Sequence, residues 1–183
     1  MKSGPGSPPE KRKQIYRGRV VTLNLETTKL PNGVTIELEV IRHQGAAAAV
    51  PLTGDGNVLL IRQYRHAAGG YIYELPAGKI DPGEEPLACA AREVEEETGR
   101  RASSITPMLS FYTTPGFTDE VIHLFLATGL APGTQNLERD EVLEVVEMPL
   151  EQAIHRIADG TIRDAKTIIG LQAAYLARGS RQP

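Results

Sequence analysis

The sequence predicts a mixed α/β fold in which helices cover a mixed sheet. Runs with the alternating apolar and polar pattern of strands lie on both sides of one stretch whose apolar residues recur at helical spacing. The order of strands, helix, strands and helices favours a sandwich of layers over an all-β or all-helical fold. The chain has 183 residues, of which 40% are hydrophobic, and this length suits one globular domain with a well-filled core.

The composition excludes several classes of protein. A formal net charge of -3 offers no broad basic surface, so we expect no nucleic-acid partner. No apolar run approaches the roughly 18 residues that a membrane span requires, and the first residues lack the apolar core of a signal peptide. The single cysteine, Cys89, allows no disulfide within the chain and no cysteine-rich metal site. We therefore expect no membrane partner and a cytoplasmic location.

The N-terminal part of the chain divides into a tail and a set of strands. Residues 1–13 are rich in Gly, Pro, Ser and Lys and have no apolar face to bury, which predicts a disordered tail. Residues 14–45 then hold N-terminal strands, with clear alternation over 16–27 and 34–43. The sequence Pro-Asn-Gly at 31–33, between these two runs, predicts a hairpin.

Residues 46–183 form the main domain in this interpretation. Residues 46–52 are a continuous run of small apolar side chains, which suits a strand buried on both faces. Pro86 and Gly99 are typical of the first turn and the end of a helix. The other expected elements are strands at 57–64, 71–75, 105–112, 121–130 and 142–148, a loop at 77–85, and helices at 149–159 and 164–178.

The expected helix carries a cluster of acids. Glu93, Glu96 and Glu97 stand at i, i+3 and i+4, so their Cβ atoms should lie roughly 5–6 Å apart on one face. One interpretation is that such a cluster is simply a solvated acidic surface, which is the common case. If it is held at the edge of a core, however, its mutual repulsion requires cations, and carboxylate oxygens suit Mg²⁺ or Mn²⁺.

The residues upstream of the cluster favour the metal interpretation. Residues 78–99 follow the pattern G-x5-E-x7-R-E-U-x-E-E-x-G, where U is aliphatic. This stretch resembles the Nudix box, and a chance match at ordinary residue frequencies is expected on the order of once in a million chains.

The resemblance extends from about residue 14 to residue 175 and points to the Nudix branch of ADP-ribose pyrophosphatases and nucleoside diphosphate sugar hydrolases. Pro115 matches a feature associated with ADP-ribose hydrolysis. The matching stretches are YRGRV (16–20), LPNG (30–33), IRQYR (61–65), ELPAGKIDPGEE (74–85), YTTPGFTDE (112–120), DEVLEV (140–145) and RDAKT (163–167). The resemblance implies a Nudix-type α/β/α sandwich with a mixed sheet, N-terminal antiparallel strands, a box helix between sheets, and a homodimer formed through the N-terminal strands.

The resemblance also assigns roles to the residues of the box. It implies metal ligands at Glu93, Glu97 and the Ala77 carbonyl, with Glu96 holding a further ion or its water. Gly78 would let the backbone turn so that this carbonyl faces the metal, and it is also a substrate-binding candidate. We expect Glu84 to pair with Arg92 and so to join the loop to the helix.

Outside the box, the resemblance implies a general base and several substrate-binding residues. Glu141 is expected to be the metal-linked general base or a ligand, with Glu138 as its substitute. The substrate-binding candidates are Arg65, Thr114 and Glu120, together with Arg42 or Arg19, one of which would replace an arginine that relatives carry where this chain has Leu38.

The sequence therefore predicts a metal-dependent pyrophosphohydrolase that cleaves ADP-ribose to AMP and ribose 5-phosphate, with Mg²⁺ or Mn²⁺ as cofactor. Two alternatives stay open at this point. One is a hydrolase of another nucleoside diphosphate sugar, such as GDP-mannose, and the other is a Nudix domain that senses a ligand without catalysis. The sequence does not determine the preferred nucleobase and sugar of the substrate or the metal. It also does not determine which loop glutamate acts as the general base.

Overall fold

The computed structural model describes residues 8–179, so most of the expected tail lies outside the described residues. Strand β1 (Lys11–Arg17) includes the last three residues of that expected tail, so the predicted boundary at residue 13 is wrong. The chain forms two compact units. Within the described residues, the first comprises residues 8–45 together with Tyr112–Val121, and the second comprises Ala46–Phe111 and residues 122–179.

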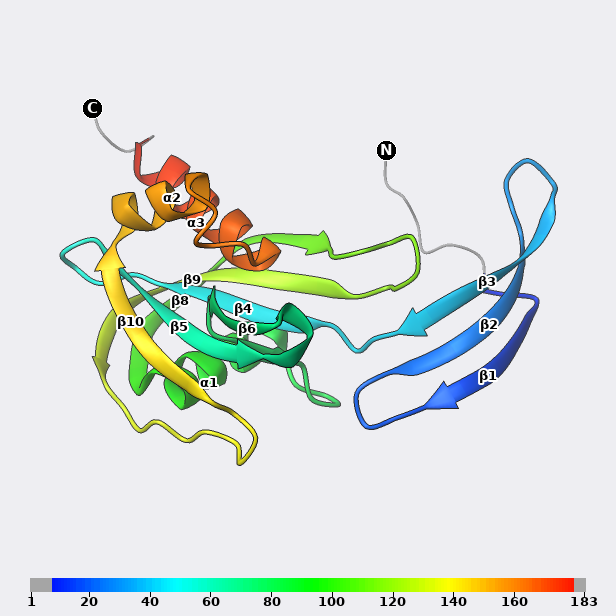
Figure 1. The fold of residues 1–183 in the computed structure, drawn as a ribbon, viewed down its shortest axis with the longest axis horizontal. Coiled ribbons are helices and arrows are strands. Elements are labelled where there is room, and N and C mark those ends of the chain that lie inside the picture. The colour runs from blue at the N-terminus through cyan, green and yellow to red at the C-terminus, as the bar shows by residue number, and fades with distance from the viewer. Residues whose placement is uncertain (1–7, 180–183) are drawn as a thin grey trace. The chain divides into compact units, whose positions relative to one another are not determined.

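The first unit contains an antiparallel sheet of β1, β2 (Thr22–Lys29) and β3 (Thr35–Arg42), in that order (Figure 1). Lys29 pairs with Thr35 across the Pro-Asn-Gly turn, which confirms the predicted hairpin. The single strand expected over 16–27 is wrong. The chain reverses between β1 and β2, where the Gly18 N–H donates to the Val21 carbonyl at 2.9 Å.

The second unit carries the remaining helices and strands of the described chain. They are β4 (Ala46–Pro51), β5 (Asn57–Arg65), the short 3₁₀ helix η1 (His66–Ala68), β6 (Gly70–Glu74), β7 (Ala77–Lys79), α1 (Pro86–Thr98), β8 (Arg100–Tyr112), β9 (Val121–Pro132), β10 (Leu143–Pro149), α2 (Leu150–Ala158) and α3 (Ala165–Gly179). The expected helices are confirmed within one or two residues. The expected loop at 77–85 is partly wrong, because its first three residues form β7 and pair with β4.

Two sheets make up this unit within the described residues. One has the strand order β7-β4-β9-β8, and the other has the order β10-β5-β6. Strand β4 runs parallel to β9 but antiparallel to β7, so the first sheet is mixed, as predicted. The second sheet is antiparallel throughout.

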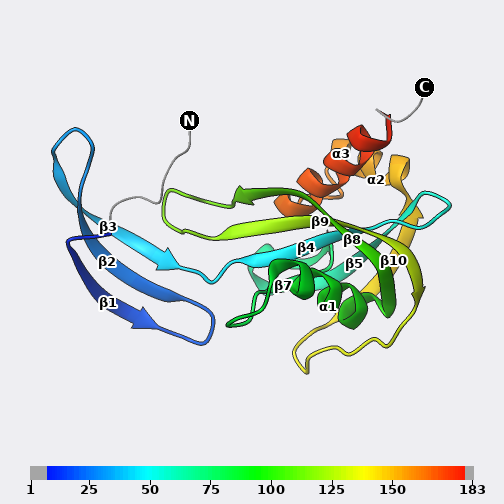
Figure 2. The ribbon, with the colours of Figure 1, turned by 180° about the vertical axis from the view of Figure 1, so that it is seen from behind.

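Alternate side chains of β4 point into two different apolar clusters, one on each face of the sheet. Ala47 and Ala49 belong to an apolar cluster with Cys89, Ala90 and Val94 of α1. Their neighbours Ala48 and Val50 belong to a separate cluster, to which α2 and α3 contribute Leu150, Ala153, Leu171 and Ala174. Strand β4 is therefore buried on both faces, with α1 on one side and α2 and α3 on the other (Figures 1 and 2).

Helix α1 packs against β4 and β7 of one sheet and against β5 and β10 of the other. This position between sheets matches the expectation for the box helix. None of the helices within residues 8–179 combines the length and the apolar character that crossing a bilayer requires.

Candidate active site

Helix α1 holds its acids at the margin of the core. Its apolar side buries Cys89, Ala90 and Val94, which fixes the orientation of the helix. The adjoining side carries Glu93 and Glu97, which are only 9% and 2% exposed. These two carboxylates are thus withdrawn from water, unlike those of an ordinary acidic surface.

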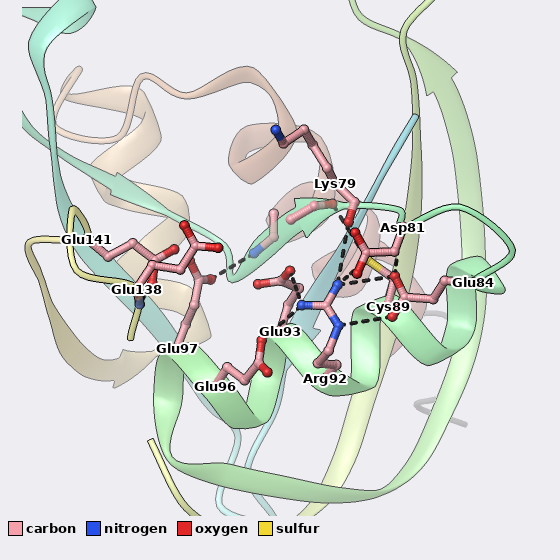
Figure 3. A network of polar contacts seen from close by, with 12 residues as sticks. Lys79, Asp81, Glu84, Cys89, Arg92, Glu93, Glu96, Glu97, Glu138 and Glu141 are labelled. Carbon is pink, nitrogen blue, oxygen red and sulfur yellow. Dashed lines mark hydrogen bonds and ion pairs between the residues drawn. The ribbon is translucent and has the colours of Figure 1, made fainter. Parts of the chain in front are cut away.

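Arg92 contacts three carboxylates at once (Figure 3). Its Nε and Nη2 donate to the two oxygens of Glu84 at 3.0 and 3.2 Å, which confirms the expected pairing. Its Nη1 donates to Glu93 at 2.7 Å and to Glu96 at 2.9 Å. The hydrogen bonds from Arg92 lower the pKa of Glu84 to about 2. Arg92 therefore joins the loop before α1 to the acids of the helix.

Glu97 binds the backbone of the neighbouring strand. The Ala77 N–H donates to its Oε2 at 2.9 Å, so the side chain reaches the first residue of β7. Burial, with the nearby charge of Glu93, raises the pKa of Glu97 to about 8. Burial also raises the pKa of Glu93, against the opposing effect of Arg92. A divalent cation at this point would favour the charged form of both carboxylates.

Gly78 is required by close approach rather than by backbone conformation. A Cβ atom at this position would lie 1.8 Å from Oε1 of Glu93, so the carboxylate or the strand would have to shift to admit it. Gly78 is not among the glycines with left-handed φ, so the turning role expected of it is not what the geometry shows. The absence of a side chain leaves room for the Glu93 carboxylate beside β7.

The loop before β10 brings Glu141 toward the acids of α1. The negative charge of Glu141 contributes to the raised pKa of both Glu93 and Glu97, so its carboxylate lies within electrostatic range of them. The Glu138 N–H donates to Oε2 of Glu141 at 2.7 Å. Figure 3 shows Glu138 and Glu141 on the Glu97 side of the cluster. The main chain of Glu138 thus orients Glu141.

The donor set suits a hard divalent cation. Carboxylate oxygens dominate it, and the Glu97 carboxyl group is buried beside the backbone N–H of Ala77, where a bound cation would favour its ionised form. Across residues 8–179, no three acidic, histidine or cysteine side chains already converge on one point. The cation that contacts Glu93 and Glu96 in this structure is the guanidinium of Arg92.

The sequence of residues 42–169 matches the NUDIX domain, which covers most of the chain. The chain belongs to the Nudix family of hydrolases. The stretch Gly78–Gly99, from β7 to the end of α1, is therefore its Nudix box, and the contacts of Arg92, Glu93 and Glu97 are contacts within that box.

Several characterised proteins resemble this chain over most of its length. A methanol dehydrogenase activator from Bacillus methanolicus is 41% identical, with 91% of each chain covered. An ADP-ribose pyrophosphatase from Bacillus subtilis is 40% identical, with 90% of each chain covered. A GDP-mannose pyrophosphatase from Cronobacter sakazakii is 37% identical over 75% of this chain and 81% of its own length.

A solved structure described as an ADP compounds hydrolase shares the fold. It superimposes with a TM-score of 0.82 at 24% sequence identity, and the match covers 99% of this chain and 100% of the other. At this identity the match concerns the fold alone, and it agrees with the Nudix-type mixed α/β architecture.

Arg65 lies in the same unit as the Nudix box and pairs with a buried acid. Its Nε donates at 2.9 Å to Oε2 of Glu74, a residue only 4% exposed, and Lys166 donates to the other oxygen at 2.9 Å. Sequence reasoning did not single out Glu74 or Lys166. Both lie in stretches that resemble the family, ELPAGK and RDAKT, and that was the only signal available for them.

The other substrate candidates belong to the first unit, where they take part in local contacts. Arg42 pairs with the buried Glu26 and donates to Asp119 at 2.9 Å. Glu120 accepts a hydrogen bond of 2.8 Å from Thr113. The Thr114 carbonyl accepts from the N–H groups of Phe117 and Thr118, and Arg19 lies in the reversal between β1 and β2.

Proposed function

We propose that this Nudix hydrolase cleaves ADP-ribose to AMP and ribose 5-phosphate in a reaction that depends on Mg²⁺. The observation that carries the proposal is the buried pair of Glu93 and Glu97, set against a glycine whose missing side chain makes room for Glu93. The choice of ADP-ribose rests on the 40% identity to the Bacillus subtilis ADP-ribose pyrophosphatase, which extends over 90% of both chains.

Glu93, Glu97 and the Ala77 carbonyl would hold the first ion, and Glu96 and Glu141 would hold a further ion or its water. When bound, a divalent ion polarises the diphosphate and lowers the pKa of its water. Mg²⁺ is preferred in this proposal because it binds carboxylates together with substrate phosphates. The support from this chain is that all of the side-chain donors are carboxylate oxygens.

The side chains then divide the chemistry among them. Glu141 takes the proton of the attacking water. The water oxygen forms a new bond to one phosphorus, the bridging P–O bond breaks, and AMP and ribose 5-phosphate leave. Arg92 keeps Glu93 and Glu96 oriented through the contacts described above. Arg65, whose side chain is 43% exposed, binds a diphosphate oxygen of the substrate in this proposal.

Further substrate contacts belong to the proposal, from Thr114, Glu120 and the backbone of Gly78, together with Arg42 or Arg19. We also propose that the enzyme is a cytoplasmic homodimer formed through residues 14–45. Support comes from apolar side chains that β1 and its neighbours leave more than half exposed, namely Ile15, Tyr16, Val20 and Val34. Light scattering after size-exclusion chromatography tests the dimer.

A second candidate substrate is GDP-mannose, favoured by the relative from Cronobacter sakazakii. Release of mononucleotide from ADP-ribose, GDP-mannose and other nucleoside diphosphate sugars, compared by kcat/KM, separates these possibilities. ADP-ribose is expected to give the highest value, and a higher value for GDP-mannose would replace it as the substrate.

Variants Glu93→Gln and Glu97→Gln test the catalytic proposal itself, alongside removal of metal with a chelator. Each change is expected to reduce the rate of AMP release at least about a hundredfold, since ligand and charge are lost together. Full activity in either variant, or in the presence of excess chelator, would overturn the proposal. Binding of ADP-ribose by the metal-loaded protein without AMP release would favour a ligand sensor instead.

A further inference from the structure

Three consecutive residues just before the Nudix box are each held by a different element. The Leu75 N–H donates to Oγ1 of Thr167 on α3 at 2.8 Å. The Pro76 carbonyl accepts from the Ala49 N–H of β4 at 3.1 Å. The Ala77 N–H donates to Glu97 of α1 at 2.9 Å. Since proline has no N–H, every backbone donor of this segment has a partner.

The contact from α3 is itself rigidly built. The Thr167 side chain is completely buried, at 0% exposure. Its hydroxyl donates to Oδ2 of Asp164 at 2.6 Å while it accepts from Leu75, so both of its roles are fixed. The same Asp164 oxygen accepts the Thr167 N–H at 3.0 Å and caps the helix. The start of α3 and the backbone of Leu75 are therefore one hydrogen-bonded unit.

Lys166 holds the residue before Leu75 from the same helix turn. Its Nζ lies 2.9 Å from Glu74 and 3.0 Å from Asp164, and its side chain is only 12% exposed. The carboxylate of Glu74 lies within electrostatic range of Glu97. Lys166 thus fixes both the position and the charge balance of an acid close to the proposed metal ligands.

Helix α3 also packs tightly against the segment that Thr167 holds. A Cβ atom at Gly170 would lie 2.5 Å from Cδ1 of Leu75 and 3.1 Å from Cγ2 of Val50. Helix α3 consequently sits directly against Leu75 and strand β4 one turn beyond Thr167. A helix seated this closely transmits small displacements to the segment that it touches.

We propose that Thr167 and Lys166 are positioning residues of the metal site, which hold Leu75 and Glu74 and thereby set Ala77 against Glu97. This inference rests on the proposed function, because it assumes that the site binds a divalent ion. Both contacts join residues 92 positions apart in the chain. Helix α3 therefore shapes the site from outside the Nudix box.

Two simpler roles make different predictions. If Lys166 acted only through its charge, its removal would tighten cation binding, because a nearby positive charge would be lost. If Thr167 only stabilised the fold, its removal would lower the melting temperature and leave metal affinity unchanged. Positioning predicts weaker metal binding in both variants.

The test is isothermal titration of metal-free full-length protein with Mn²⁺, at one pH and temperature, together with kcat and KM for ADP-ribose. Thr167→Val removes the hydroxyl at nearly constant shape, and Thr167→Ser is its matched control because it keeps the hydroxyl. Lys166→Met removes the ammonium, and Lys166→Arg keeps the charge. Near-ultraviolet circular dichroism checks that each variant is folded.

We expect Thr167→Val to weaken Mn²⁺ binding about tenfold or more, with a parallel loss of kcat, as for other residues that orient metal ligands. Thr167→Ser should stay within about twofold of the wild type, and Lys166→Met should weaken binding about fivefold. Wild-type Mn²⁺ affinity in folded Thr167→Val would overturn the inference. If Thr167→Val does not fold, unchanged or tighter binding by Lys166→Met would overturn it. Failure of the wild type to bind Mn²⁺ or to release AMP would instead contradict the proposed function.

Discussion

The guanidinium of Arg92 pairs side-on with the carboxylate of Glu84, through Nε at 3.0 Å and Nη2 at 3.2 Å. Glu84 lies in the loop after β7, while Arg92 lies on α1 two turns into the helix. The remaining Nη1 is thereby turned toward Glu93 and Glu96. One planar cation therefore sets the loop and orients two of the proposed ligands at the same time.

This arrangement predicts that Arg92→Lys is not a conservative change. A lysine ammonium is a point charge and cannot pair with Glu84 side-on while it contacts the other two acids. We expect kcat/KM for ADP-ribose to fall roughly 10–100-fold, with the protein still folded. Steady-state kinetics with saturating Mg²⁺ measures the effect.

Arg101→Lys is the matched control for that variant. Arg101 also pairs side-on with a box residue, Glu95, at 2.7 and 3.0 Å. That pair is exposed and faces away from the acids, so its loss should change kcat/KM less than about twofold. Equal losses in the two variants would show that the Arg92 geometry has no special role.

Gly78→Ala should disrupt the metal site by steric overlap. The added methyl group would lie 1.8 Å from Oε1 of Glu93, so the carboxylate or strand β7 must move. We expect metal affinity and kcat each to fall at least about tenfold, because ligand position is lost. Titration with Mn²⁺ and the rate of AMP release measure the two effects separately.

Gly54→Ala provides the corresponding control. A Cβ atom at Gly54 would meet no heavy atom within 4 Å, and its φ is not left-handed. This variant should keep wild-type metal affinity and activity. If Gly78→Ala behaved in the same way, the close approach of Glu93 to β7 would be irrelevant to function.

The parts of the site that the sequence predicts are those encoded locally. Helix α1 was foreseen because Pro86 begins it, Gly99 ends it, and the apolar residues between them recur at helical spacing. The pairing of Glu84 with Arg92 joins residues only eight positions apart within one motif. A short motif on a single loop and helix leaves few alternative geometries.

The parts that the sequence did not predict depend on contacts between distant segments. Lys166 and Glu74 meet only because α3 packs against the end of β6, and no local pattern reports that contact. The contacts of Arg42 with the buried Glu26 on the neighbouring strand and with Asp119 were not predicted either, for the same reason. The reversal after β1 was not predicted, because residues 18–21 read Gly-Arg-Val-Val and Gly18 is the only turn-forming residue among them.

Binding of a divalent ion should release a proton from Glu97. Burial raises its pKa to about 8, so most of the metal-free protein carries a protonated Glu97 at neutral pH. A metal ligand must be ionised, so binding displaces that proton. Apparent Mn²⁺ affinity should therefore increase as pH rises toward about 8 and then level off. Titration calorimetry in two buffers with different ionisation enthalpies counts the protons released.

The same shift predicts how the stability of the metal-free protein depends on pH. The pKa of Glu97 is raised from an ordinary 4.5, so the folded state holds the proton more tightly than the unfolded state. Its contribution to stability is fully present below the ordinary value and is lost as pH rises through about 8. Thermal melts without metal should show this loss, and Glu97→Gln should remove it. If the difference in melting temperature between the wild type and Glu97→Gln did not change with pH, the raised pKa would not belong to Glu97.

Glu141→Gln should abolish proton transfer by residue 141 while keeping the hydrogen bond within the loop. Glutamine cannot accept the proton of the attacking water, yet its side-chain oxygen can still accept the Glu138 N–H that Glu141 accepts at 2.7 Å. We expect kcat to fall about 10²–10⁴-fold, the usual contribution of a general base. Glu138→Gln keeps that N–H and should lose less than about threefold, since Glu138 is only the substitute for Glu141 as the base and Glu141 is intact in this variant. A larger loss in Glu138→Gln would make Glu138 the base, and nearly full activity in both variants would mean that neither residue takes the proton.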